Sequence, residues 1–370
     1  MKYLDTQLQL SRVERPGGET LEPPKDMDEF VPSYSFSSEN ISLARRHPTG
    51  DTRSLSNSTS SVDTHLATCH HDYTGPHKPT SVFLAPSTWS VSFFDSHFRV
   101  NDALTKGDLI SGEDTLLPVY AMRKINLQTK ELNPTPTHGL AGGVMAYMDP
   151  MKYPRSCETP PGWVMSLGLY PGCADAMSLK TLRIYMDVLP TVPLGPVGFN
   201  LETALLGERK IQRDVFRHVL QYASVRRPLV ISLRSQRGDT SDLIFCTALT
   251  DLQEFCGSAQ PMHLRGFTGS GETVRKWLKF FPNTYFSLYV GEQPMIQPID
   301  VLTAIPKERL LLESAAPVTI EAGTTPLISP AYVGDVGICI AKWLNVDIIL
   351  LAEVTTANGR RLFKPVQKKQ

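Results

Sequence analysis

The sequence lacks the long apolar segments that mark a membrane protein. Nowhere does it reach the roughly 20 consecutive apolar residues that a membrane-spanning helix requires. The opening segment, Met1–Arg15, is interrupted by charged and polar residues, which is untypical of a secretory signal. We therefore expect an intracellular protein, cytoplasmic or nuclear, with no membrane partner.

Cysteine is scarce and charge is balanced. The six cysteines are scattered without a CxxC pair, which argues against a disulfide framework or a zinc knuckle and favours reduced thiols. Lysine plus arginine and aspartate plus glutamate both number 37, so the formal net charge is zero. No global field then draws in nucleic acid or acidic membranes.

Residues 1–90 have too few apolar side chains to offset the entropy of ordering the chain. Ser, Thr and Asn dominate from Ser33 to Ser61, after the Pro23-Pro24 pair. We predict a disordered tail over 1–90, which could carry contacts with protein partners, and one folded domain over 91–365.

The folded part alternates short apolar runs with helical patterns. A helix-like run before Pro228 leads into a continuous apolar strand, which is typical of parallel sheets covered on both faces. Strand and helix alternate about eight times, which predicts a TIM-type (β/α)8 barrel. The expected strands are Phe93–Phe98, Gly139–Met148, Gly162–Pro171, Pro193–Asn200, Pro228–Ser235, Pro261–Gly269, Thr284–Gly291 and Arg309–Pro317. The expected helices are Asp175–Val188, Lys210–Arg226, Asp239–Cys256, Gly271–Phe281, Pro298–Ile305 and Tyr332–Leu344. The segment 101–136 is only partly periodic and is interpreted as an elaborated first connection.

The residues that end the strands of such a barrel meet at one mouth, so the motifs at those ends carry the chemistry. Together they resemble those of TatD-family deoxyribonucleases, most of all an animal branch with long N-terminal extensions. The resemblance covers about 91–363. It rests on Asp95-Ser-His-Phe-Arg99, Gly195-Pro-Val-Gly-Phe-Asn200, the Gln212 to Arg234 segment, Arg265-Gly-Phe-Thr-Gly-Ser270, Arg309-Leu-Leu-Leu-Glu-Ser-Ala-Ala-Pro317, Asn358 and Phe363.

The resemblance implies a site for two divalent metals, but this sequence departs from it. The family's six metal-ligand positions fall on His97, Arg99, Pro196, Ser232, Arg265 and Ala315. Of these side chains, His97 alone can ligate a metal as the family does, since arginine has no lone pair and proline and alanine have no donor atom. In addition, Asn200 occupies a position where the family has an Asp, and Tyr170 occupies a position where it has a His. With no metal cofactor expected, the chain is interpreted as a pseudoenzyme on a nuclease scaffold.

Two interpretations of the arginines stay open. Arg99 and Arg265 could pair with Asp95 and Glu313 and hold the mouth together without ions. Alternatively, Arg99, Arg234 and Arg265 form a cradle for single-stranded nucleic acid or another phosphorylated ligand, because guanidinium forks match phosphate oxygens.

Three functions follow. The first is a catalytically inactive binding or scaffold protein. The second is a weak 3′–5′ deoxyribonuclease that uses Mg²⁺ or Mn²⁺ in a rebuilt site of Asp95, His97, His263 and Glu313. The third is a metal-independent hydrolase, for which the sequence offers no convincing pair of nucleophile and base.

Overall fold

A computed structural model describes residues 91–106, 117–132, 138–154, 156–171, 175–201, 206–234, 242–290, 299–317 and 328–365. The expected disordered tail, 1–90, lies outside the described residues. Within the described part of the chain, no helix is both long and apolar enough to cross a membrane.

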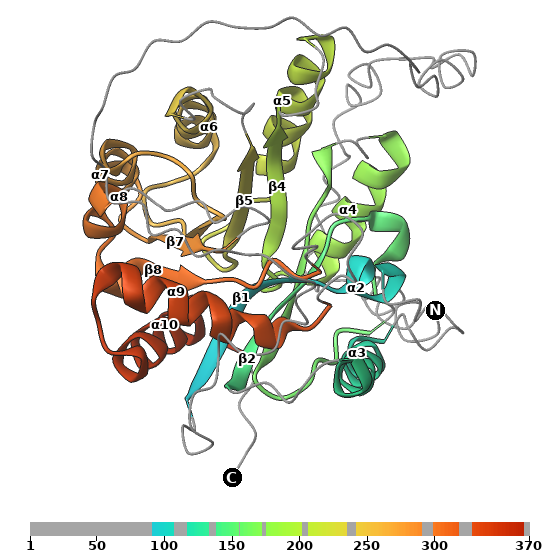
Figure 1. The fold of residues 1–370 in the computed structure, drawn as a ribbon. Helices are drawn as coiled ribbons and strands as arrows, with labels where there is room; N and C mark the ends of the chain where they lie inside the picture. The colour runs from blue at the N-terminus through green and yellow to red at the C-terminus, as the bar shows by residue number, and fades with distance from the viewer. Residues whose placement is uncertain are drawn as a thin grey trace, which may run out of the picture. The chain divides into compact units, whose positions relative to one another are not determined.

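Eight parallel strands form one sheet in chain order, each hydrogen-bonded to the next, and Figure 1 shows helices outside them. This is the TIM-type (β/α)8 barrel that the sequence predicts. The strands are β1 (Ser92–Arg99), β2 (Gly139–Tyr147), β3 (Trp163–Leu167), β4 (Leu194–Asn200), β5 (Leu229–Arg234), β6 (Met262–Arg265), β7 (Thr284–Leu288) and β8 (Leu310–Leu312). The α-helices are α2 (Val100–Lys106), α3 (Pro118–Leu132), α4 (Ala176–Val188), α5 (Leu206–Leu220), α6 (Asp242–Phe255), α7 (Gly271–Phe280), α8 (Ile299–Ala304), α9 (Val333–Leu344) and α10 (Ile348–Phe363). Short 3-10 turns are η3 (Pro150–Lys152), η5 (Lys307–Arg309) and η6 (Pro330–Tyr332).

The helices begin and pack as their sequences dictate. In α7, the Ser270 side chain accepts a hydrogen bond from the Thr273 N–H, the capping arrangement that contributes about 1 kcal/mol. Val274 and Trp277 then point from one face of α7 into the core. Helix α10 begins in the same way, because the Asp347 side chain accepts hydrogen bonds from N–H groups of its first turn.

Side chains and backbone join the first strand to the last. Ser96 Oγ donates to the Leu312 carbonyl at 2.8 Å, and the Arg99 N–H donates to the Ala316 carbonyl at 2.9 Å. Asp95 accepts a hydrogen bond from the Ser314 N–H at 3.0 Å. Much of the conspicuous β1 motif therefore serves to close the barrel.

Apolar side chains fill the inside of the barrel near the amino ends of the strands. A separate apolar cluster within the barrel includes Phe94, Val230 and Tyr285 from the strands, together with Leu362 and Phe363 from the end of α10. Helix α10 lies close to β1, since a Cβ on Gly359 would stand 2.3 Å from Phe94 Cδ1. The opposite, carboxyl ends of the strands carry the polar residues described next.

Candidate functional site at the barrel mouth

An ion pair occupies the centre of the mouth. Arg265, at the end of β6, is 9% exposed, and its Nη2 donates to Glu313 Oε1 at 2.6 Å. The other Glu313 oxygen accepts hydrogen bonds from Ser287 Oγ at 2.5 Å and from the Gly266 N–H at 3.2 Å. Burial alone would raise the pKa of Glu313, but the charge of Arg265 and these hydrogen bonds outweigh it and lower that pKa. Glu313 is therefore a fully engaged carboxylate.

His263 lies next to this pair, with its Nε2 2.8 Å from Ser287 Oγ. Because Ser287 donates its single proton to Glu313, its oxygen accepts from His263 Nε2, which fixes the neutral tautomer. Burial lowers the pKa of His263 to about 4, and the ring packs edge-on against Phe363. The nitrogen that donates to Ser287 cannot also hold a metal.

Within the described residues, the ring of His97 makes no hydrogen bond. Its side chain is fully buried, and neither ring nitrogen has a hydrogen-bond partner within the described residues. Burial lowers the pKa of His97 well below its usual value, and the charges of Arg265, Arg99 and Arg234 lower it further. The mouth thus holds a neutral imidazole with two unsatisfied nitrogens beside three guanidinium groups.

The other two arginines contact different groups. Arg99 Nη1 donates to Asp102 at 2.9 Å, while its Nη2 donates to the carbonyls of Ala315 and Pro317. Arg234 Nη1 donates to the Tyr289 hydroxyl at 2.6 Å. The interpretation of internal pairing is thus confirmed for Arg265 with Glu313, whereas the carboxylate partner of Arg99 is Asp102 rather than Asp95.

The Asp95 side chain points toward the seam between β1 and β8, where the first strand meets the last. It accepts hydrogen bonds from the Ser314 hydroxyl at 2.5 Å and from the N–H groups of Ser314 and His97. Burial raises the pKa of Asp95 to about 8 despite these hydrogen bonds. At neutral pH this carboxyl group is largely protonated, which suits a structural contact better than a metal ligand.

The remaining expected positions lie at the mouth without forming a ligand set. Ser232 Oγ is 3.4 Å from Arg265 Nη1, and Pro196 and Ala315 are buried. Asn200 and Tyr170, which depart from the family pattern, face each other, with Asn200 Nδ2 3.4 Å from the Tyr170 hydroxyl.

These residues do not fit a pair of divalent cations. Two such ions need several oxygen or imidazole donors to replace their lost hydration. In the described part of the chain, no group of three or more His, Cys, Asp or Glu side chains is placed to hold a metal ion. Glu313 is bonded to Arg265, and Asp95 to Ser314. We therefore derive no step through a metal.

Comparison with known proteins identifies the family. The model of the TatD related DNase family matches residues 138–364. The chain belongs to this family. An uncharacterized metal-dependent hydrolase of Bacillus subtilis, YabD, is 30% identical over 192 residues, which cover 51% of this chain and 71% of that protein. The human 3′-5′ RNA nuclease TATDN2 is 27% identical over 158 residues, which cover 41% of this chain and 20% of that protein.

Solved structures agree on the fold. The TatD homologue YJJV of Escherichia coli K12 superposes with a TM-score of 0.53 at 19% identity, covering 74% of this chain and 98% of that one. An uncharacterized amidohydrolase of Saccharomyces cerevisiae gives a TM-score of 0.53 at 15% identity, covering 74% and 100%. The TatD family model begins after β1, so the assignment of His97 and Arg99 to ligand positions stays a prediction.

Sequence reasoning missed the groups that satisfy the buried acids. Ser287 and Tyr289 follow Tyr285 at two-residue steps on β7 and beyond it, the spacing of one strand face. That spacing could have pointed to Ser287 as an inward-facing polar residue. Ser314, which directly follows Glu313, gives no comparable signal.

Proposed function

We propose that this TatD-family barrel binds a phosphate group of a single-stranded nucleic acid at its mouth without cleaving it through metal ions. The observation that carries the proposal is the buried His97 side chain, whose two nitrogens have no hydrogen-bond partner within the described residues and whose pKa the charges of Arg265, Arg99 and Arg234 lower. A buried polar atom without a partner costs about 1–3 kcal/mol. Because His97 is fully buried, a phosphate oxygen could accept the imidazole N–H and relieve part of that cost only if the side chains above the ring move aside. Guanidinium groups supply the charge-assisted hydrogen bonds that phosphate favours.

The charges of the mouth suit an anion better than a cation. Arg265 is balanced by Glu313 and Arg99 by Asp102, while Asp95 is largely neutral because burial raises its pKa. Arg234, whose Nη1 donates to the Tyr289 hydroxyl, is a third guanidinium group at the mouth. With these groups, a metal would meet repulsion at the place where a phosphate would meet hydrogen-bond donors.

One observation favours a second candidate, a weak metal-dependent nuclease. The relatives include proteins named metal-dependent hydrolase and 3′-5′ RNA nuclease. Such an activity would need Glu313 and His263 to leave Arg265 and Ser287 and turn toward metal ions. We rank it second because that rearrangement would leave Arg265 buried without its carboxylate.

Binding of a fluorescein-labelled 12-nucleotide oligothymidylate to the full chain, measured by anisotropy in EDTA, tests the proposal. The variant Arg99→Gln/Arg234→Gln removes two guanidinium groups but keeps the Arg265–Glu313 pair. We expect its affinity to fall at least about tenfold, since each hydrogen bond to a charged group contributes about 1.5–3 kcal/mol and about 1.4 kcal/mol corresponds to a factor of ten.

The matched control removes two cations from the exposed face of α7, in Arg275→Gln/Lys279→Gln. It should retain the wild-type affinity. Equal losses in both variants, or unchanged affinity in the mouth variant with an intact circular dichroism spectrum, would contradict binding at the mouth.

A further inference from the structure

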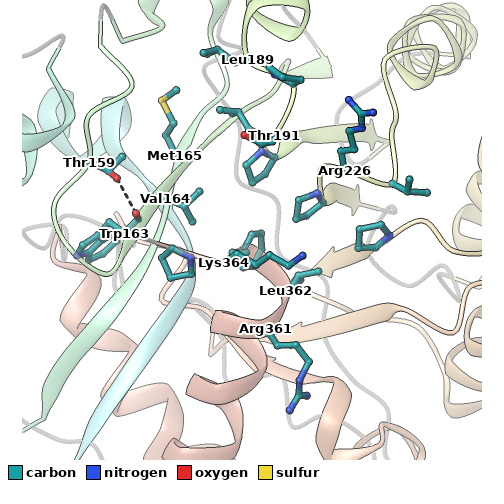
Figure 2. A pocket seen from close by; sticks show the side chains of 18 of the residues that line it. Thr159, Trp163, Val164, Met165, Leu189, Thr191, Arg226, Arg361, Leu362 and Lys364 are labelled. Atoms are coloured by element: carbon teal, nitrogen blue, oxygen red, sulfur yellow. Dashed lines mark hydrogen bonds between the residues drawn. The ribbon is translucent and has the colours of Figure 1, made fainter. Parts of the chain in front are cut away.

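A groove of about 890 Å³ lies at the opposite end of the barrel from the mouth. It is lined by the segments that enter the strands and by the end of α10 (Figure 2). Three of those segments are the turn after α4, the turn before β5 and the segment before β8, represented by Leu189, Arg226 and Arg309. Nothing in the mouth site uses these residues.

The lining of this amino-end groove is rich in proline, which makes it apolar and poor in backbone donors. Pro190, Pro193, Pro228, Pro261 and Pro365 belong to it, and proline has no N–H to offer a ligand. The side chain of Val225, also on the lining, is 60% exposed. Such a surface suits the apolar side chains of a ligand.

The charge of the groove has one sign. Its described lining residues include four cations, Arg226, Arg309, Arg361 and Lys364, and neither Asp nor Glu. Tyr285 holds Arg309 in place, since the guanidinium lies over its ring at 4.9 Å and Nη1 is 3.2 Å from its hydroxyl. Figure 2 shows Arg226 and Arg361 on opposite sides of Lys364. An occupant with negative charges spaced along its length would meet these cations.

The scarcity of exposed aromatic rings in the lining favours a peptide over nucleic acid as the occupant. Single strands stack their bases on aromatic rings, but Trp163, Tyr285 and Phe363 in the lining are only 7%, 4% and 5% exposed.

We propose that the amino-end groove binds an extended acidic peptide segment of a partner protein, with its carboxylates paired to the cations of the lining and its apolar side chains packed on the prolines of the lining. Arginine forks pair with carboxylates in two-bond geometry, which gives direction to such a contact. The proposal is independent of ligand binding at the mouth.

The test uses the full chain and a labelled decapeptide, Glu-Leu-Pro-Glu-Val-Pro-Glu-Leu-Pro-Glu, with fluorescence anisotropy as the readout. A second peptide replaces each glutamate with glutamine. We expect the acidic peptide to bind and the neutral one to bind at least about tenfold more weakly. Failure of the acidic peptide to bind at millimolar protein overturns the proposal.

Protein variants locate the contact. Arg226→Gln/Lys364→Gln removes two exposed groove cations and should weaken the acidic peptide about fivefold to tenfold, since exposed ion pairs are individually modest. The control Arg275→Gln/Lys279→Gln and the mouth variant Arg99→Gln/Arg234→Gln should leave it unchanged. Equal loss in the control variant would overturn the proposal.

Cys157 provides a second readout without a substitution. It is an exposed thiol on the lining of the groove, so bound peptide should slow its alkylation by iodoacetamide, followed by mass spectrometry. Cys246, outside the lining, serves as the internal reference. An unchanged rate at Cys157 under saturating peptide, or a 12-nucleotide oligothymidylate that protects it better than the peptide does, contradicts an acidic-peptide groove.

Discussion

The two ends of this barrel both carry arginines but use them differently. At the mouth, Arg265 is buried and bonded to Glu313, because a buried charge without a partner is too costly to keep. At the amino end, Arg226 and Lys364 are exposed and line the proline-rich groove. A buried cation is engaged in an internal ion pair, whereas an exposed cation can still bind a partner.

The largest difference between the two ends should appear when one acid is neutralised. Glu313→Gln leaves Arg265 buried without its carboxylate, and breaking such a pair costs about 3–5 kcal/mol. Urea unfolding measures the loss. Glu308→Gln is the matched change near the amino end, where the exposed acid stands 4.0 Å from Lys307, and it should cost less than about 1 kcal/mol. Similar costs for the two substitutions would remove the contrast.

The free energy of unfolding should depend on pH through Asp95, which lies at the seam between β1 and β8. Its pKa is raised by burial from 3.8 to about 8, so the folded protein binds a proton that the unfolded chain releases. The resulting stability is complete below pH 4 and is lost as the pH rises toward 8, by up to about 1.4 kcal/mol per pH unit.

Asp95→Asn should remove that slope. The measurement is the difference between the stability curves of wild type and variant from pH 4 to pH 9. A flat difference across this range would mean that Asp95 is ionised in the folded protein, as a metal ligand would be.

Replacing His97 should change the stability of the fold less than the preceding substitution, and it should raise the stability rather than lower it. Replacing it with leucine removes two buried nitrogens without partners, which should stabilise the free protein by about 1 kcal/mol. The same change should weaken oligothymidylate binding. A destabilised His97→Leu protein would show that the ring has a structural partner, and unchanged binding would separate His97 from the ligand.

The smallest effect belongs to the amino-end groove. Arg226→Gln/Lys364→Gln should change the free energy of unfolding by less than about 0.5 kcal/mol, as surface substitutions usually do. Thermal unfolding without peptide checks this. A larger loss would mean that these cations stabilise the barrel, so their effect on peptide affinity would have to be corrected for folding.

The strand order could be predicted from the sequence because eight short apolar runs alternate with helical patterns. Helix α10 was missed, since its isoleucines and threonines disfavour a helix in isolation and its packing on Phe94 is invisible in the sequence. Helices α2 and α3 likewise occupy much of the segment 101–136, which is only partly periodic.

The pairing of Arg265 with Glu313 could be inferred from charge and strand position. The environment of Asp95 could not, because β1 pairs with β2 irregularly between Asp95 and Phe98. Such an irregularity re-aims side chains locally. The sequence resemblance remains the main guide to which positions held metal ligands in related proteins.

The most direct test of the account is degradation of end-labelled single-stranded DNA by the full chain, with Mg²⁺, with Mn²⁺ and with chelator. Arg265→His/Ala315→Asp, which places His and Asp at two positions where the sequence resemblance implies metal ligands, is run beside it. We predict no metal-dependent digestion by the unmodified protein. Digestion that requires Mg²⁺ or Mn²⁺, stops with chelator and disappears in His97→Ala would contradict the account and establish a rebuilt metal site.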